Sequence, residues 1–143
     1  MDYKKILKNM NLDHSKFTPK AFKNKISSLK NDLVSAGEYI KYARDGFEKL
    51  VVEVYKKYDQ MLISNNAVDF DDLLILPIKL FKENSDILTK YQERFKYILI
   101  DEYQDTNEAQ YVLTKLLASK YQNICVVGDS DQAIYGFRGA NFK

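Results

Sequence analysis

A short apolar run that ends in two acids constrains this chain more than any other stretch. Residues 97–100 read Tyr-Ile-Leu-Ile, and Asp101 and Glu102 follow directly. Four β-favouring residues in a row predict a strand that is buried on both faces, as in a parallel sheet. Ligands of open α/β sheets bind at the carboxyl ends of the strands. One carboxylate there can hold Mg²⁺ while a second orients a water; an acidic turn that merely begins a helix is the alternative interpretation.

A second apolar run follows about one helix further along the chain. Residues 124–127 read Ile-Cys-Val-Val and end in Gly128. Between the two runs, residues 105–108 read Asp-Thr-Asn-Glu, which resembles a capping box, and the leucines that follow would share one face of a helix. A strand, a helix and a strand of these lengths predict a right-handed βαβ unit with two parallel strands. The polar residues after each strand would then lie side by side.

These residues resemble two motifs of the superfamily-1 DNA helicases. Residues 101–107 (Asp-Glu-Tyr-Gln-Asp-Thr-Asn) resemble motif II, and residues 127–140 (Val-Gly-Asp-Ser-Asp-Gln-Ala-Ile-Tyr-Gly-Phe-Arg-Gly-Ala) resemble motif III. Residues 69–73 (Asp-Phe-Asp-Asp-Leu) resemble a short block that precedes motif II. The chain is similar to the UvrD/Rep/PcrA type over nearly all of its length, and two long motifs in the correct order make the resemblance specific.

The resemblance implies roles for single residues. Asp101 matches the position that helps to hold Mg²⁺ on ATP, and Glu102 matches the carboxylate that orients and deprotonates the attacking water. Gln132 matches the glutamine that touches the γ-phosphate. The positions that face single-stranded DNA in the family correspond to Tyr135, Phe137 and Arg138. Aromatic rings stack on unpaired bases whatever their sequence; hydrophobic packing of the loop is the alternative for both aromatic residues.

The chain also departs from the family pattern. Phe137 stands where Trp is more common, and none of the five glycines is followed by Lys, so the phosphate loop G-x-x-x-x-G-K-[ST] is absent from these residues. The later motifs would lie beyond Lys143. We therefore expect a fragment, with an all-helical insertion domain over residues 1–67 and a partial RecA-like motor domain over residues 68–143. Such a fragment would be inactive alone.

The resemblance implies a parent protein that is an ATP-dependent 3′–5′ DNA helicase and translocase of repair and replication. Its partners would be ATP with Mg²⁺, single-stranded DNA and junctions between single-stranded and double-stranded DNA. The expected fold class is α/β and mostly α-helical, with parallel strands at about 97–101 and 124–128. Two alternatives stay open. One is a subunit of a helicase-nuclease, and the other is a truncated stand-alone DNA-binding module whose acids are vestigial.

Composition agrees with a globular protein and adds little about its function. The 143 residues amount to one ordinary domain or two partial ones, and there is no signal peptide or transmembrane run. A cytoplasmic setting fits. Residues 1–60 carry 13 Lys and Arg against 8 Asp and Glu, which suits a surface near nucleic acid but equally a solvated helical face. Cys125, the single cysteine, is expected to pack in a buried strand.

Local signals predict helices before the first strand. Short helices are expected at residues 3–10 and after a capping box at residues 35–38, and a long one from about Asp45 to Ser64. Thr18 and Pro19 predict the start of another helix. We expect Asp69 to cap a further helix that Pro77 kinks or ends, and a short helix at residues 86–94. For Asp69, Asp71 and Asp72, helix capping is favoured over a metal role. No metal role is expected for His14.

Overall fold

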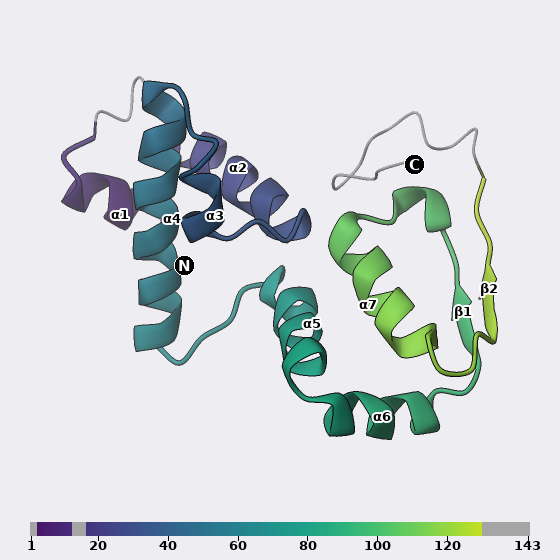
Figure 1. Ribbon diagram of the computed structural model, residues 1–143. Coiled ribbons are helices and arrows are strands. Elements are labelled where there is room, and N and C mark those ends of the chain that lie inside the picture. The colour runs from purple at the N-terminus through teal and green to yellow at the C-terminus, as the bar shows by residue number, and fades with distance from the viewer. Residues whose placement is uncertain (1–2, 13–16, 130–143) are drawn as a thin grey trace. The chain divides into compact units, whose positions relative to one another are not determined.

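The computed structural model describes residues 3–12 and 17–129, and the chain divides into two compact units. The helical unit comprises residues 1–30 and 34–70, and the strand unit comprises residues 31–33 and 71–143. Over the described residues there are seven α-helices, one 3₁₀ helix and two strands (Figure 1). The fold class predicted from the sequence, mostly helical with a small parallel sheet, is therefore confirmed. His14 lies outside the described residues.

Four helices form the helical unit, and all four were predicted. Their bounds are α1 Tyr3–Asn9, α2 Pro19–Asn31, α3 Ala36–Tyr39 and α4 Gly46–Ser64. The caps are local: the Ser35 hydroxyl accepts the Glu38 N–H, and the Glu38 carboxylate accepts the Ser35 N–H at 2.9 Å. Hydrogen bonds from the Ser35 side chain and backbone lower the pKa of Glu38. The Asp45 carboxylate accepts the Glu48 N–H at 2.7 Å and so begins α4.

The core of the helical unit forms where one face of α4 meets α1 and α2. Phe22 and Ile26 of α2 are fully buried, and the ring of Tyr3 stacks on that of Tyr58 with centroids 4.6 Å apart. Burying one such apolar side chain contributes about 1.5–3 kcal/mol. The α4 side chains of this core repeat at helical spacing and include Val51, Val54, Tyr55, Tyr58 and Leu62.

The helical unit contains a buried ion pair between Lys30 and Asp69. It bears on the prediction that Asp69 caps a helix. The N-cap position of the next helix is Asp71 and not Asp69, whose Oδ2 accepts from Lys30 Nζ at 2.7 Å and from the Tyr58 hydroxyl at 3.0 Å. The Lys30 side chain is only 3% exposed, and a buried ammonium group needs an opposite charge nearby. The next helix, α5 (Asp72–Glu83), instead follows Asp71, whose side chain makes no capping hydrogen bond.

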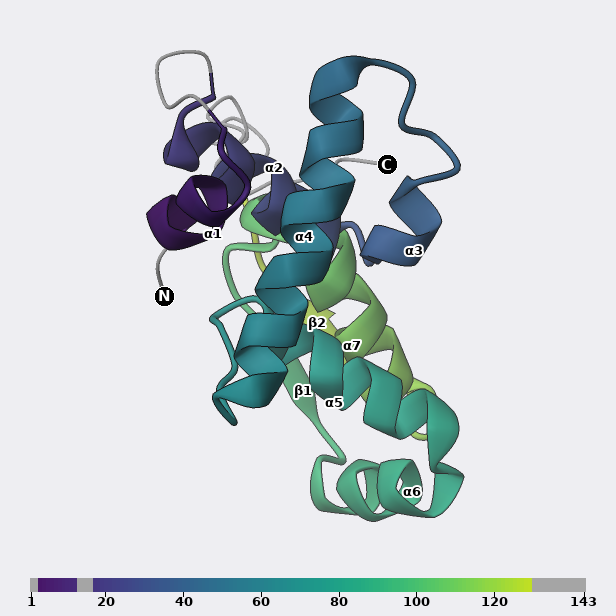
Figure 2. The same cartoon turned by 90° about the vertical axis from the view of Figure 1, so that its left-hand side faces the viewer.

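Three helices and the sheet make up the strand unit. Helix α5 continues through Pro77 to Glu83, so of the kink or early end predicted there the early end does not occur, while α6 (Ser85–Arg94) lies where a short helix was predicted. Figure 2 shows α5 running beside α7 (Glu108–Ala118). Helices α6 and α7 are joined by the buried Gln92, whose Nε2 donates to Leu116 O at 2.8 Å and to Ser119 Oγ at 2.9 Å.

The start of α7 corrects a second prediction about capping. A capping box is present, but Asn107 rather than Asp105 is the N-cap residue. The Asn107 side chain accepts the Gln110 N–H at 2.9 Å, and the Gln110 side chain accepts the Asn107 N–H at 3.1 Å. The cap lies two residues later because Tyr103–Asp105 first form a 3₁₀ helix, η1. Asn107 Nδ2 also donates to Asn31 Oδ1 at 2.7 Å, so residue 31 belongs to this unit.

The two strands pair as predicted, but they are not buried. Strands β1 (Ile98–Ile100) and β2 (Ile124–Val126) are parallel, with Leu99 opposite Cys125. Leu99 is 70% exposed and Cys125 is also exposed, so the prediction of strands buried on both faces is wrong for this chain. Side chains alternate between the two faces of a strand: Ile100, Ile124 and Val126 line the hollow beside the last helix of the unit, whereas Leu99 and Cys125 do not. Over the part of the chain that the structure describes, no helix has the length and apolar character to cross a membrane.

Candidate functional site at the carboxyl edge of the sheet

The acids after β1 and the glycine after β2 meet at one edge of the sheet. Backbone pairing continues past the strands, because Val127 N–H donates to Ile100 O at 2.8 Å and Tyr103 N–H donates to Val127 O at 3.0 Å. Asp101 and Glu102 therefore lie beside Gly128. This is the adjacency that a parallel βαβ unit predicts for the residues at the carboxyl ends of its strands.

The chain turns sharply at Glu102 as it leaves the strand. Glu102 has φ 52° and ψ 41°, in the left-handed region, which costs a residue with a side chain about 1–2 kcal/mol. The turn is held locally: Glu102 N–H donates to Asp101 Oδ1 at 2.8 Å, and Asp105 N–H donates to Glu102 O at 2.9 Å. Both Asp101 and Glu102 remain exposed. Backbone strain of this kind is found most often at functional sites.

Gln104 is the residue of this site that the sequence interpretation missed. Its side chain is buried, with the residue 3% exposed. The Nε2 group donates to Oε2 of Glu102, and Oε1 accepts the backbone N–H of Asp129 at 3.0 Å. Gln104 thus joins the acidic turn after β1 to the segment after β2. The residue stands inside the motif already singled out, but a contact with a segment 25 residues away leaves no local pattern.

Gly128 lies so close to Gln104 that a side chain there would require its neighbours to shift. A Cβ at this position would lie 2.7 Å from Gln104 Oε1 and 3.2 Å from both Gln104 N and Tyr103 Cβ. The carboxamide occupies the space that a side chain would need. The glycine therefore favours the close approach of these two segments.

The two acids border a small hollow whose wall is partly polar. It has a volume of about 310 Å³, and its lining includes Asp101, Glu102, Asp105, Thr106 and Gln110. Mg²⁺ is usually held in proteins by one or two carboxylates, with phosphates and waters completing its shell. One Asp101 oxygen is engaged by the Glu102 N–H, which leaves the other for a cation. Asp101 therefore fits the part of a carboxylate ligand to Mg²⁺.

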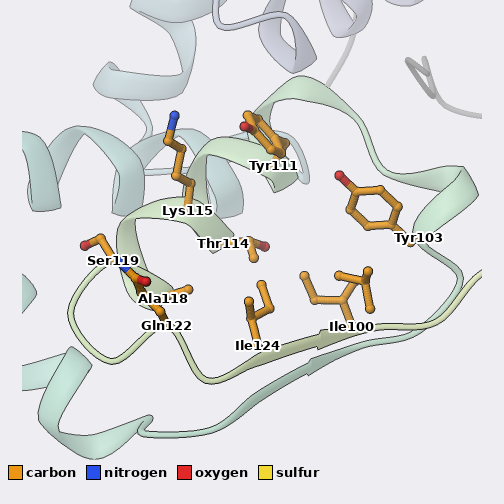
Figure 3. Close-up of a pocket in the computed structure, with 10 residues that line it drawn as sticks. Ile100, Tyr103, Tyr111, Thr114, Lys115, Ala118, Ser119, Gln122 and Ile124 are labelled. Carbon is orange, nitrogen blue, oxygen red and sulfur yellow. The ribbon is translucent and has the colours of Figure 1, made fainter. Parts of the chain in front are cut away.

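A larger hollow lies between α7 and the sheet but carries none of these acids. Its volume is about 550 Å³, and Figure 3 shows Ile100 and Ile124 pointing from the strands toward Thr114 of α7. Its wall is mainly apolar and contains no carboxylate, although Lys115, Thr114 and Ser119 also line it. The smaller hollow is the better candidate site because both acids line it.

Four residues with roles implied by the family lie outside the described residues. They are Gln132, Tyr135, Phe137 and Arg138. The structure therefore leaves untested the predicted contacts of these side chains with the γ-phosphate and with DNA. Of the predicted site residues, the described part of the chain contains Asp101 and Glu102, and it places them together.

A parallel βαβ unit with an Asp-Glu pair at its carboxyl edge places the chain in the class of α/β proteins whose ligands bind at that edge. The whole chain, residues 1–143, matches the family model described as the UvrD/REP helicase N-terminal domain. The chain belongs to this family.

Individual relatives agree with the family match. The chain is 51% identical over 140 residues to a protein of Staphylococcus aureus named ATP-dependent DNA helicase PcrA. It is 50% identical over the same length to the protein of that name from Staphylococcus epidermidis. Each alignment covers 98% of this chain and 19% of the relative. The chain therefore spans about a fifth of the length of these helicases.

Proposed function

We propose that the carboxyl edge of β1 and β2 serves ATP hydrolysis in an ATP-dependent 3′–5′ DNA helicase and translocase. The observation that carries the proposal is the placement of Asp101 and Glu102 beside Gly128 at a partly polar hollow. The similarity to relatives named ATP-dependent DNA helicase supports it. Phosphoryl transfer needs mainly positioning and charge neutralisation, so one acid for the metal and one for the water is a sufficient set.

The two acids have different tasks in this proposal. Asp101 holds Mg²⁺ through the carboxylate oxygen that the Glu102 N–H leaves open. The bound Mg²⁺ supplies positive charge that neutralises the phosphates. Glu102 orients the attacking water and accepts its proton, and Gln132 contacts the γ-phosphate. An amide can respond to phosphate loss because its N–H groups donate to an anion that then departs.

The segment from Gln132 to Arg138 is proposed to couple the state of the nucleotide to the grip on DNA. Tyr135 and Phe137 would stack on unpaired bases, at about 1–3 kcal/mol per base, and Arg138 would pair with a phosphate or a carboxylate. These residues lie within six positions of Gln132. Loss of the γ-phosphate would therefore change the contacts of this segment with single-stranded DNA or with a junction to duplex DNA.

The domain assignment is also part of the proposal. Residues 1–67 form the helical insertion domain, and residues 68–143 form the part of the first motor domain that carries motifs II and III. No glycine of the chain is followed by lysine, so the phosphate cradle of such motors is not supplied by these residues. We expect the 143 residues alone to hydrolyse ATP poorly and not to unwind DNA.

The substitution Glu102→Gln in a full-length protein containing this chain tests the proposal. We expect kcat for ATP to fall by about 10²–10⁴-fold, because the general base is lost, while nucleotide binding is retained. The amide oxygen can still accept from Gln104 Nε2, so the local structure should persist. The matched control is Glu93→Gln, at an exposed glutamate of α6 that contacts Lys120 and Tyr121. Turnover that survives Glu102→Gln would remove Glu102 from the proposed role.

A further inference from the structure

We propose that Gln104 is a positioning residue that holds the Glu102 carboxylate and ties it to the segment after β2. The inference rests on the proposed function of Glu102. Gln104 is 3% exposed, donates to Oε2 of Glu102, and accepts from Asp129 N–H at 3.0 Å. The exposed carboxylate thus has one fixed, buried neighbour that determines where its second oxygen points.

The chemistry of the carboxamide explains why the residue is glutamine. An amide side chain offers a donor and an acceptor on two separate atoms of one terminal group, whereas an ionised carboxylate offers acceptors alone. At Gln104 the donor meets a carboxylate and the acceptor meets a backbone N–H, so both halves are satisfied. Glutamate would lose the donor and bring a second negative charge next to Glu102, and leucine would lose both bonds. Reacting groups held by packed and hydrogen-bonded neighbours need less reorganisation.

The contact with Gly128 makes this link sensitive to the segment after β2. A Cβ on Gly128 would meet Gln104 Oε1 at 2.7 Å, and the backbone N–H of Asp129 donates to the same atom at 3.0 Å, so this backbone lies close to the carboxamide. Any displacement of residues 128–129 must move or release the Gln104 side chain, and with it the hydrogen bond to Glu102. The segment proposed to sense the γ-phosphate and DNA begins three residues after Asp129. Gln104 is therefore the connection through which that segment reaches the water-orienting carboxylate.

Steady-state kinetics of the full-length protein test the positioning role. We expect Gln104→Leu to lower kcat about 10–100-fold, the usual size for neighbours that orient a reacting group. The KM for ATP and the affinity for a non-hydrolysed ATP analogue should stay close to wild type, because the residue does not contact nucleotide. Stimulation by single-stranded DNA should also shrink.

Gln92→Leu is the matched control for the loss of a buried amide. Gln92 is 6% exposed and makes two hydrogen bonds in the same unit, to Leu116 O and Ser119 Oγ, but does not contact the acids. The substitution Gln92→Leu should lower the stability of the protein while leaving kcat for ATP unchanged. Equal losses of kcat in the two variants, or an unchanged kcat in Gln104→Leu, would overturn the inference.

A second measurement on the 143-residue chain does not depend on activity. The side-chain NH₂ resonances of Gln104 in ¹⁵N spectra should shift in Glu102→Gln and in Gly128→Ala, because each change alters a direct neighbour. The control is Gly46→Ala, since a Cβ at Gly46 meets no atom within 4 Å. The contact would be refuted if the Gln104 resonances did not shift in either variant, or if they shifted equally in Gly46→Ala.

The two proposals can fail separately. If the wild-type full-length protein hydrolyses ATP and Gln104→Leu does so equally well, the positioning role is refuted while the proposed function stands. If Glu102→Gln retains turnover, the proposed function fails, and the positioning role of Gln104 fails with it. The resonance shifts then report only a structural contact.

Discussion

The two units of this chain bury different kinds of side chain. The helical unit has a continuous apolar core, built on residues such as Phe22, Ile26 and Val51 that are fully buried. The described part of the strand unit buries few apolar side chains and leaves its strands exposed. Its buried residues include three amides, Gln92, Gln104 and Asn107. The first unit is held by the hydrophobic effect, whereas in the second buried hydrogen bonds position the loops that carry the acids.

The largest expected difference concerns one apolar residue from each unit. Phe22→Ala should lower the free energy of unfolding of the helical unit by about 3–5 kcal/mol, because it opens a cavity in a packed core. Leu99→Ala in β1 should change stability by less than about 0.5 kcal/mol, because Leu99 is 70% exposed. Hydrogen exchange of the amides in each unit, measured for both variants, separates the two effects. Comparable losses of protection would show that Leu99 is packed after all.

A smaller effect is expected at the ion pair of the helical unit. Lys30→Met should cost about 1.5–3 kcal/mol, because Asp69 loses a charged hydrogen-bond partner in a largely buried setting. Lys56→Met is the matched control, since Lys56 Nζ lies 3.8 Å from Glu53 Oε1 and both side chains are exposed. This substitution should lower the free energy of unfolding by well under about 1 kcal/mol. Denaturant unfolding of the two variants makes the comparison. If Lys56→Met proved as costly, burial would not be what gives the Lys30 pair its value.

The smallest perturbation is a chemical probe of the strand unit. Cys125 is the only cysteine, and it is exposed in β2. Its thiol in the native 143-residue chain should react with a thiol-specific reagent at a rate close to that of the chain in denaturant, because access is what limits reactions of buried thiols. A native thiol that reacts a hundredfold more slowly would show that the strands are covered and that the contrast between the two units is overstated.

Local chemistry explains which parts of the fold the sequence predicted. The caps at Ser35 and Asp45 lie within three residues of their partners, so the pattern alone indicated them. The partner of Asp69 is Lys30, 39 positions away, and no local pattern could separate that ion pair from a helix cap. The apolar runs predicted the strands and their pairing. Their burial depends on what packs against them, which the run itself does not specify.

The same distinction applies to the candidate site. Asp101 and Glu102 could be placed because an apolar strand that ends in acids carries its own signal. Gln104 could not be identified in this way, because its role depends on hydrogen bonds to Glu102 and to the distant Asp129. A buried polar residue within a loop of acids becomes recognisable as a positioning group only when the second segment is in place.

The most direct test of the central claim is ATP hydrolysis, measured with and without single-stranded DNA. The 143-residue chain should be compared with a full-length protein that contains it. We predict turnover stimulated by DNA in the full-length protein alone, because the acids at the edge of β1 and β2 need a phosphate cradle from elsewhere. Hydrolysis by the 143 residues at the same rate would contradict the fragment interpretation, and its absence from both would contradict the ATPase assignment itself.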